Sequence, residues 1–126
     1  MEALSKRFEK RVDEIAAQYP NFHRDIYRHV FRSLEALGRQ PFGVSGRGVS
    51  AVNLVKDGIV SLAVNDWGVL AFSVFCFWGI GTGADLRKVL ERLVQFKVLR
   101  QDAGECLDQL DSLDLKEIFF ERLKNR

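Results

Sequence analysis

Three glycines, Gly79, Gly81 and Gly83, alternate in a short stretch that follows an apolar run and precedes a charged helical pattern. A glycine loop lets the backbone approach a phosphate, and free N–H groups at the start of a helix attract anions. One hypothesis is therefore an anion-binding loop formed by these glycines and Thr82. The spacing matches neither Gly-x-Gly-x-x-Gly nor a loop that ends in Gly-Lys-Ser/Thr. The sequence favours a tight turn between two packed helices.

Five basic residues lie on or just after a helix predicted over residues 83–96. They are Arg87, Lys88, Arg92, Lys97 and Arg100. In a winged-helix unit this helix would enter a major groove, and the basic side chains would contact phosphates or another partner. Glu91 interrupts the patch, and the acidic residues that follow would repel a phosphate backbone. The alternative is a solvated helix face with pairs at i, i+4 spacing.

The remaining reactive residue types form no catalytic constellation. His23 and His29 are six residues apart and would point to different faces of one helix, so they cannot share a metal ion. Cys76 lies in an apolar run, where a core position is expected and a reactive thiolate is disfavoured. We expect no catalytic residue, metal site or cofactor, and the sequence does not favour an enzyme.

The chain has 126 residues, of which 47% are hydrophobic and 29% are charged, with a net charge of +2. These values are typical of one globular domain, and the charge permits an acidic partner without requiring one. Two cysteines make no disulfide framework, and the N-terminus has no apolar core of a signal peptide. We therefore expect a cytoplasmic location.

The longest uncharged segment runs over 18 residues, from Trp67 to Ala84. Its centre, Val69–Trp78, is apolar on all sides, which predicts a helix that is buried on every side. Ten helical residues reach only ~15 Å, about half of a bilayer core. The sequence therefore predicts a central core helix and no membrane contact.

Helical spacing of apolar residues predicts six helices. They cover residues 4–19, 21–37 with Asn21 as the N-cap, 45–63 with Ser45 as the cap, 69–78, 83–96 and 116–123. Thr82 and Asp85 form a capping signature for the fifth helix. Alternating residues predict strands over 97–101 and 113–115, separated by an acidic loop over 102–111, and a very short strand is considered over 42–44.

This order predicts a mainly α protein with five to six helices and a C-terminal β-hairpin. The core would be winged-helix-like and preceded by two extra N-terminal helices. We expect a single domain over 1–126. It would comprise an N-terminal helical pair over 1–38, the winged-helix-like core over 44–115, and a C-terminal helix and tail over 116–126.

Several short motifs recur together along residues 20–120. They are Tyr27 with Val30-Phe31 and Leu34, Val44-Ser45-Gly46-Arg47, Trp78-Gly79-Ile80 with Thr82 and Asp85, Leu93-Val94 before Val98-Leu99, and Leu113-Asp114-Leu115 with Phe119. In these motifs the chain resembles an uncharacterised family of small bacterial proteins known chiefly from planctomycetes and verrucomicrobia. The chain departs from the family pattern at Gly43, which replaces a histidine, and at Arg87 and Arg92, which replace a glycine and an asparagine. The resemblance implies the element order and gives no catalytic residues.

The sequence supports three function hypotheses. The first is a non-enzymatic binding module that contacts nucleic acid or protein. The second is a protein-interaction or homodimerisation module without nucleic-acid binding, with exposed aromatic anchors such as Phe8, Tyr19 or Phe22. The third is a nucleotide or anion binder that uses the loop over 79–83.

Overall fold

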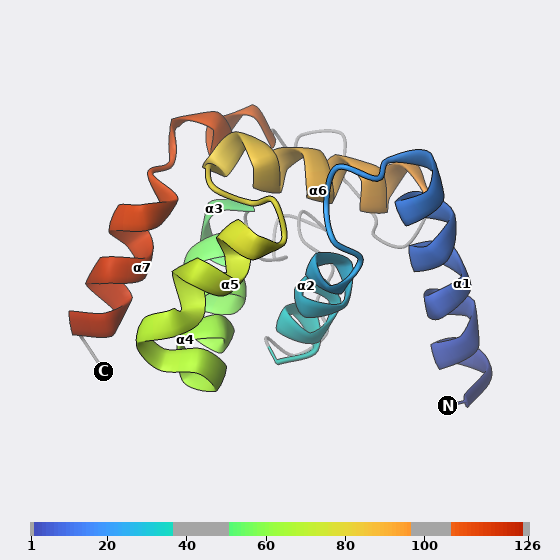
Figure 1. The fold of residues 1–126 in the computed structure, drawn as a ribbon, viewed down its shortest axis with the longest axis horizontal. Helices are drawn as coiled ribbons and strands as arrows, with labels where there is room; N and C mark the ends of the chain where they lie inside the picture. The colour runs from blue at the N-terminus through green and yellow to red at the C-terminus, as the bar shows by residue number, and fades with distance from the viewer. Residues whose placement is uncertain (1, 37–50, 97–106, 125–126) are drawn as a thin grey trace.

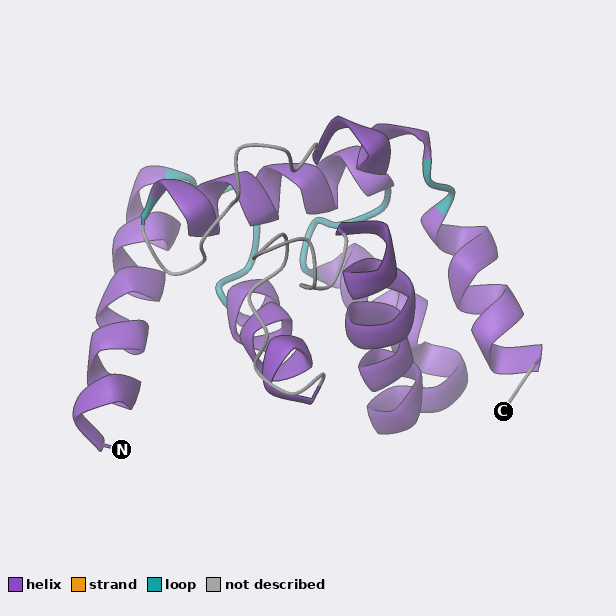
Figure 2. Ribbon diagram, turned by 180° about the vertical axis from the view of Figure 1, so that it is seen from behind, coloured by secondary structure: helices purple, strands orange, loops and turns teal. Residues whose placement is uncertain are grey.

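The computed structural model describes residues 2–36, 51–96 and 107–124, and within these ranges every regular element is a helix. Figure 1 shows α6 (Gly83–Gln95) lying across one end of the molecule, with the other long helices running away from it on one side. The outermost helices of this array are α1 (Glu2–Gln18) and α7 (Leu115–Lys124), and Figure 2 shows the same arrangement from behind. The predicted mainly α character is confirmed.

The N-terminal pair consists of α1 and α2 (Asp25–Ala36), as predicted. α1 buries Val12 and Ile15, which the helical spacing places on its inner face. The predicted N-cap is wrong, because α2 begins at Asp25, whose backbone N–H donates to His23 Nδ1 (3.1 Å). The side chain of Asn21 instead accepts a hydrogen bond from Arg92 of α6 (3.2 Å).

The third predicted helix is a run of turns that changes type along its length. It comprises α3 (Ala51–Asn53), the π-helix η2 (Leu54–Val60) and α4 (Ser61–Trp67). Its buried side includes Leu54, Val55, Ile59 and Val60. The predicted start at Ser45 lies outside the described residues.

The chain reverses at Gly68, where φ is +57° and ψ is −129°, a conformation that glycine adopts readily. The break between the helices predicted over 45–63 and 69–78 falls at this glycine, and α4 continues through residues 64–67 beyond the predicted end. One 3-10 turn, η3 (Gly68–Leu70), leads into α5 (Ala71–Phe77), which packs back against α4. The predicted helix over 69–78 is therefore also confirmed as helical.

The predicted burial of this helix on every side is wrong. Ala71, Phe75 and Trp78 are buried, but Val69 and Phe77 are each 78% exposed and Leu70 is 62% exposed. Cys76, expected in the core, is exposed. The reason is that α5 is covered only on its inner side. In Figure 1 it lies on the near side of the molecule in front of α4, and no described helix covers it.

The stretch Leu54–Phe77 is long and apolar enough to cross a membrane, judged by length and composition alone, with a mean hydropathy of 1.7. Only 33% of its most apolar window is buried. The reversal at Gly68 folds the stretch into two arms, so it is not one straight helix (Figure 1). A core helix of a globular protein passes the same test, so the indication is weak.

The predictions of a C-terminal β-hairpin and of a winged-helix wing are wrong. No strand occurs in the described ranges, and the segment predicted as the second strand, Leu113–Leu115, leads into α7. The carboxylate of Asp114 accepts a hydrogen bond from the Glu117 backbone N–H (3.2 Å), so Asp114 caps this helix. Apolar residues on both sides of a cap produce the same alternation as a short strand. The other predicted strands, over 97–101 and 42–44, lie outside the described residues.

The predicted acidic loop is helical where the structure describes it. η4 (Leu107–Ser112) is a 3-10 helix that packs along α6 and buries Leu107 and Leu110. Over its described parts, residues 51–96 and 107–115, the predicted core is therefore built of helices, and the predicted winged-helix unit is wrong.

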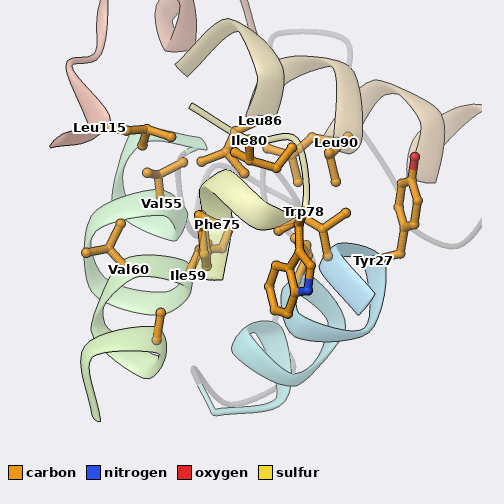
Figure 3. Close-up of a cluster of buried hydrophobic side chains, with 14 of the residues drawn as sticks. Tyr27, Val55, Ile59, Val60, Phe75, Trp78, Ile80, Leu86, Leu90 and Leu115 are labelled. Carbon is orange, nitrogen blue, oxygen red and sulfur yellow. The ribbon is translucent and has the colours of Figure 1, made fainter. Parts of the chain in front are cut away.

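The hydrophobic core forms where α6 meets the inner sides of the other helices. Figure 3 shows Ile80, Leu86 and Leu90 above, Val55, Ile59 and Val60 on one side, and Phe75 and Trp78 at the centre. Phe75 contacts Trp78 and Phe119, with ring centroids 5.5 Å and 4.9 Å apart. The core therefore holds the start of α6 in place, along with the glycine loop before it.

Candidate functional site

The loop before α6 binds an anion that the protein itself supplies. The Asp85 carboxylate accepts hydrogen bonds from the backbone N–H groups of Gly81 (2.9 Å) and Thr82 (3.1 Å). In return, the Thr82 hydroxyl accepts from the Asp85 backbone N–H (3.2 Å), which completes the predicted capping box. Two of the loop N–H groups that a phosphate could use are thus engaged in capping the helix.

Two of the three glycines are required by close packing. Gly79 has φ of +94°, and a Cβ atom there would lie 2.8 Å from the Asn21 carbonyl oxygen. A Cβ atom at Gly83 would lie 2.0 Å from the Leu110 carbonyl oxygen, because α6 and η4 approach each other at this point. Gly81 has open space around it. These contacts explain Gly79 and Gly83 without a ligand.

Arg87, the first residue of the predicted basic patch, is bound within the protein. Its guanidinium donates to Asp111 of η4 (2.6 Å) and to Glu91 one turn further along α6 (2.6 Å). The hydrogen bond to Asp111 raises the pKa of Arg87, and the charge of Glu91 adds to the effect. Arg87 therefore joins η4 to α6 and faces two carboxylates.

Arg92 is also engaged inside the molecule. Its guanidinium carbon lies 4.1 Å from the centre of the Tyr19 ring and 4.9 Å from that of Phe22, which are cation–π contacts. It donates to Asn21 and, at 3.4 Å, to the hydroxyl of Tyr27. Burial raises the pKa of Tyr27 although Arg92 opposes this effect. Arg92 therefore holds α6 against the segment that joins α1 to α2.

The remaining predicted basic residues form no patch in the described structure. Lys88 is exposed on α6, while Lys97 and Arg100 lie outside the described residues. Since Arg87 and Arg92 are engaged with other side chains, the three predicted residues that the structure describes do not form a free cationic surface.

The two histidines lie in different surroundings. His23 is exposed, beside Phe77 with ring centroids 6.0 Å apart. His29 is 2% exposed, and its ring lies among those of Trp67, Phe75 and Trp78 at 5.5–5.9 Å. In the ranges that the structure covers, no group of three or more His, Cys, Asp or Glu residues could hold a metal ion.

His29 has one satisfied nitrogen and one that lacks a partner. Its Nε2–H donates to the Ile59 carbonyl oxygen in η2 (2.8 Å), because a carbonyl can only accept. Nδ1 is buried with no hydrogen-bond partner. Burial lowers the pKa of His29, and the hydrogen bond to Ile59 and the charge of Asp66 only partly oppose this effect. The neutral ring thus ties α2 to η2.

The aromatic residues proposed as exposed anchors are mostly covered. Phe22 is buried, and Phe8 is half-buried and stacked on Phe31 with ring centroids 4.4 Å apart. Tyr19 is half-buried beneath the guanidinium of Arg92. These three positions do not provide an aromatic docking surface.

A surface that sequence reasoning misses lies on η3 and α5. Its five members are exposed and uncharged, and we call them the α5 stripe: Val69, Leu70, Ser73, Cys76 and Phe77. At 100° per residue they span an arc of about 120° on one side of the helix. The signal is present in the sequence as the absence of charge over residues 67–84, but that signal also fits complete burial.

A hollow of about 490 Å³ lies beside α7. Its lining carries charges of both signs and includes Arg122, which pairs with Asp57 (3.0 Å). Half-buried Leu113 and Ile118 form its apolar part. The lining contains no nucleophile set against a base, so the hollow has no catalytic geometry among the described residues.

Comparison of the chain with protein-family models, with curated proteins and with solved structures finds no match. The predicted bacterial family therefore stays a prediction, and the function is argued from the surfaces of the molecule alone.

Proposed function

We propose that this chain is a non-enzymatic interaction module that forms a homodimer through the α5 stripe. The observation that carries the proposal is the exposure of Val69, Leu70 and Phe77 on one helix face that bears no charge. A contiguous apolar surface that is left in water is typical of an interaction site.

The composition of the stripe supports a second copy as the partner. Between Asp57 and Asp85 the only charged residue is Asp66, which is held by Arg32 of α2 (3.3 Å). Two identical stripes would therefore meet without repulsion between like charges. In a two-fold arrangement, Phe77 of one copy lies opposite Val69 and Leu70 of the other, and Ser73 at the centre allows close approach.

The expected affinity is modest. Burying a large apolar side chain contributes roughly 1.5–3 kcal/mol when the burial is complete, and the three residues are already partly covered. Two stripes together would then gain about 10 kcal/mol, against an association cost of roughly 4–15 kcal/mol. With the association cost at its low end, the net gain of about 6 kcal/mol corresponds to a dissociation constant of roughly 40 μM.

The test is sedimentation velocity from low micromolar to millimolar protein. The wild-type chain should shift from monomer to dimer as concentration rises. The double substitution Leu70→Ser with Phe77→Ser should remain monomeric. Phe120→Ser is the matched control, because Phe120 is 60% exposed on α7 outside the stripe. This variant should dimerise like the wild type.

A second readout uses Cys76, which lies within the stripe. In a Cys106→Ser background, a short bismaleimide should cross-link two copies through Cys76, and the Leu70→Ser, Phe77→Ser variant should lose the cross-link. A wild-type chain that stays monomeric at every concentration would refute the proposal. Equal loss of the dimer in the Phe120→Ser control would also refute it.

A further inference from the structure

Two acids of α1 pair with arginines at and just before α2. Glu9 and Asp13 lie on the side that faces α2, where Glu9 binds Arg28 (2.6 Å) and Asp13 binds Arg24 (2.7 Å). The hydrogen bonds from Arg28 lower the pKa of Glu9. Glu9 and Asp13 are thus each paired with an arginine from outside α1.

The bases of α1 occupy a different side and face solvent. We define the basic face of α1 as Lys6, Arg7, Lys10 and Arg11, all of which are exposed. At 100° per residue they lie within an arc of about 140°, which also contains one acid, Glu14. Among the side chains that the structure describes, only Arg11 of this face has an ion-pair partner, Glu14 at 3.3 Å. Arg7, Lys10, Arg11 and Glu14 line a shallow hollow of about 290 Å³.

We propose that the basic face of α1 binds the phosphate backbone of a double-stranded nucleic acid. Cations at i, i+4 spacing repeat about every 6 Å along the helix, as in the pairs Lys6–Lys10 and Arg7–Arg11. Figure 1 shows α1 as the outermost helix at one end of the array, so an extended polyanion can lie along it. Phosphate contacts of this kind give affinity without sequence specificity.

The same helix disfavours the other polyanionic surfaces. A helix that binds a membrane inserts its apolar side into lipid, but Val12 and Ile15 of α1 are fully buried in the protein. Single strands are held by exposed aromatic platforms, whereas Phe8 is stacked on Phe31 away from the basic face. A duplex needs neither feature.

This inference does not depend on the proposed homodimer. Figures 1 and 2 both show α2 between α1 and α5, so the basic face and the α5 stripe are separate surfaces. Each copy could bind a duplex alone, and a dimer would present two basic faces.

The test is a fluorescence-anisotropy titration of a labelled mixed-sequence DNA duplex at several salt concentrations, with protein below the concentration at which it dimerises. If the three cations without a partner each release one counterion, a fourfold rise in salt should lower the wild-type affinity about 40-fold. The triple substitution Lys6→Gln, Arg7→Gln, Lys10→Gln should bind at least tenfold more weakly at low salt and lose most of the salt dependence.

The matched control removes three exposed lysines elsewhere, Lys56→Gln, Lys88→Gln and Lys116→Gln. It should bind within about twofold of the wild type. Equal losses in the two triple variants would show general charge attraction and would overturn the proposal. Binding to phosphatidylserine vesicles or to polyglutamate with no binding to the duplex would overturn it too, as would unaltered binding by the α1 variant. Circular dichroism checks that both variants are folded.

Discussion

Replacing Gly83 by alanine provides a direct test of the reason why the loop before α6 is rich in glycine. A Cβ atom at this position would lie 2.0 Å from the Leu110 carbonyl oxygen and 3.0 Å from that of Leu113. Real Cβ contacts do not fall below 3.0 Å, so α6 and η4 would have to separate by about 1 Å or more. Both neighbours are backbone atoms, which cannot turn away as a side chain could.

The magnitude follows from two opposing terms. Overpacking of this kind costs roughly 1–3 kcal/mol or more, and here it also loosens Leu107 and Leu110 against α6. Alanine is favoured over glycine in a helix by up to about 1 kcal/mol. Together the two terms lead us to expect that Gly83→Ala lowers the free energy of unfolding by about 1–2 kcal/mol, which is a fall of roughly 5 °C in Tm for a domain of this size.

Gly81→Ala is the matched control in the same loop. A Cβ atom at Gly81 would have no other atom within 4 Å, and the backbone N–H of this residue, which donates to Asp85, is kept. This variant should be as stable as the wild type or up to about 1 kcal/mol more stable. Urea and thermal unfolding of the three proteins measure the difference. If Gly83→Ala is as stable as Gly81→Ala, the packing argument for this loop is wrong.

Three further predictions concern the loop, the buried histidine and the helix contacts. Added ATP or inorganic phosphate should leave the wild-type Tm unchanged, because Asp85 already accepts from the loop N–H groups; a clear rise would restore the anion-binding hypothesis. The pKa of His29 is lowered in the folded state, so the folded protein binds a proton there less readily than the unfolded chain. The free energy of unfolding is therefore highest above the ordinary pKa of about 6.5 and falls as the pH drops below that value towards the folded pKa, by at most about 1.4 kcal/mol per pH unit. His29→Gln should flatten the pH dependence of the unfolding free energy between about pH 7 and 5, and an unchanged slope would contradict the assignment. Arg92→Ala should lower the unfolding free energy by about 1–2 kcal/mol in urea titrations, because it removes cation–π contacts and hydrogen bonds, whereas Lys88→Ala on the same helix should be neutral.

Local signals predict the helices well. The Thr82–Asp85 capping box and the turn near Gly68 are set by residues a few positions apart, so their geometry can be derived from the sequence. The same kind of signal is present at Asp114, which is followed three residues later by Glu117 and flanked by apolar residues. The strand prediction fails there because a segment of three residues fits both the helical and the strand period.

Contacts between distant segments cannot be derived in this way. The sequence predicts a basic surface at Arg87 and Arg92 because both lie on the charged side of one helix. Their partners, Asp111 and the Tyr19 and Phe22 rings, come from segments before and after that helix. A single amphipathic pattern does not distinguish a solvent-facing arginine from one that stacks on a neighbouring ring.

The apolar run over 67–84 shows why burial is the hardest property to infer. An apolar helix without charges gains free energy when any of its sides is removed from water, and this also applies to the exposed α5 stripe. Whether the chain itself supplies that cover depends on how many neighbours the topology provides. Here the other helices supply a cover on the inner side only, and Phe77 and Val69 stay exposed. The same feature that predicts a buried core helix from the sequence therefore indicates, once the fold is known, a surface that a second molecule can cover.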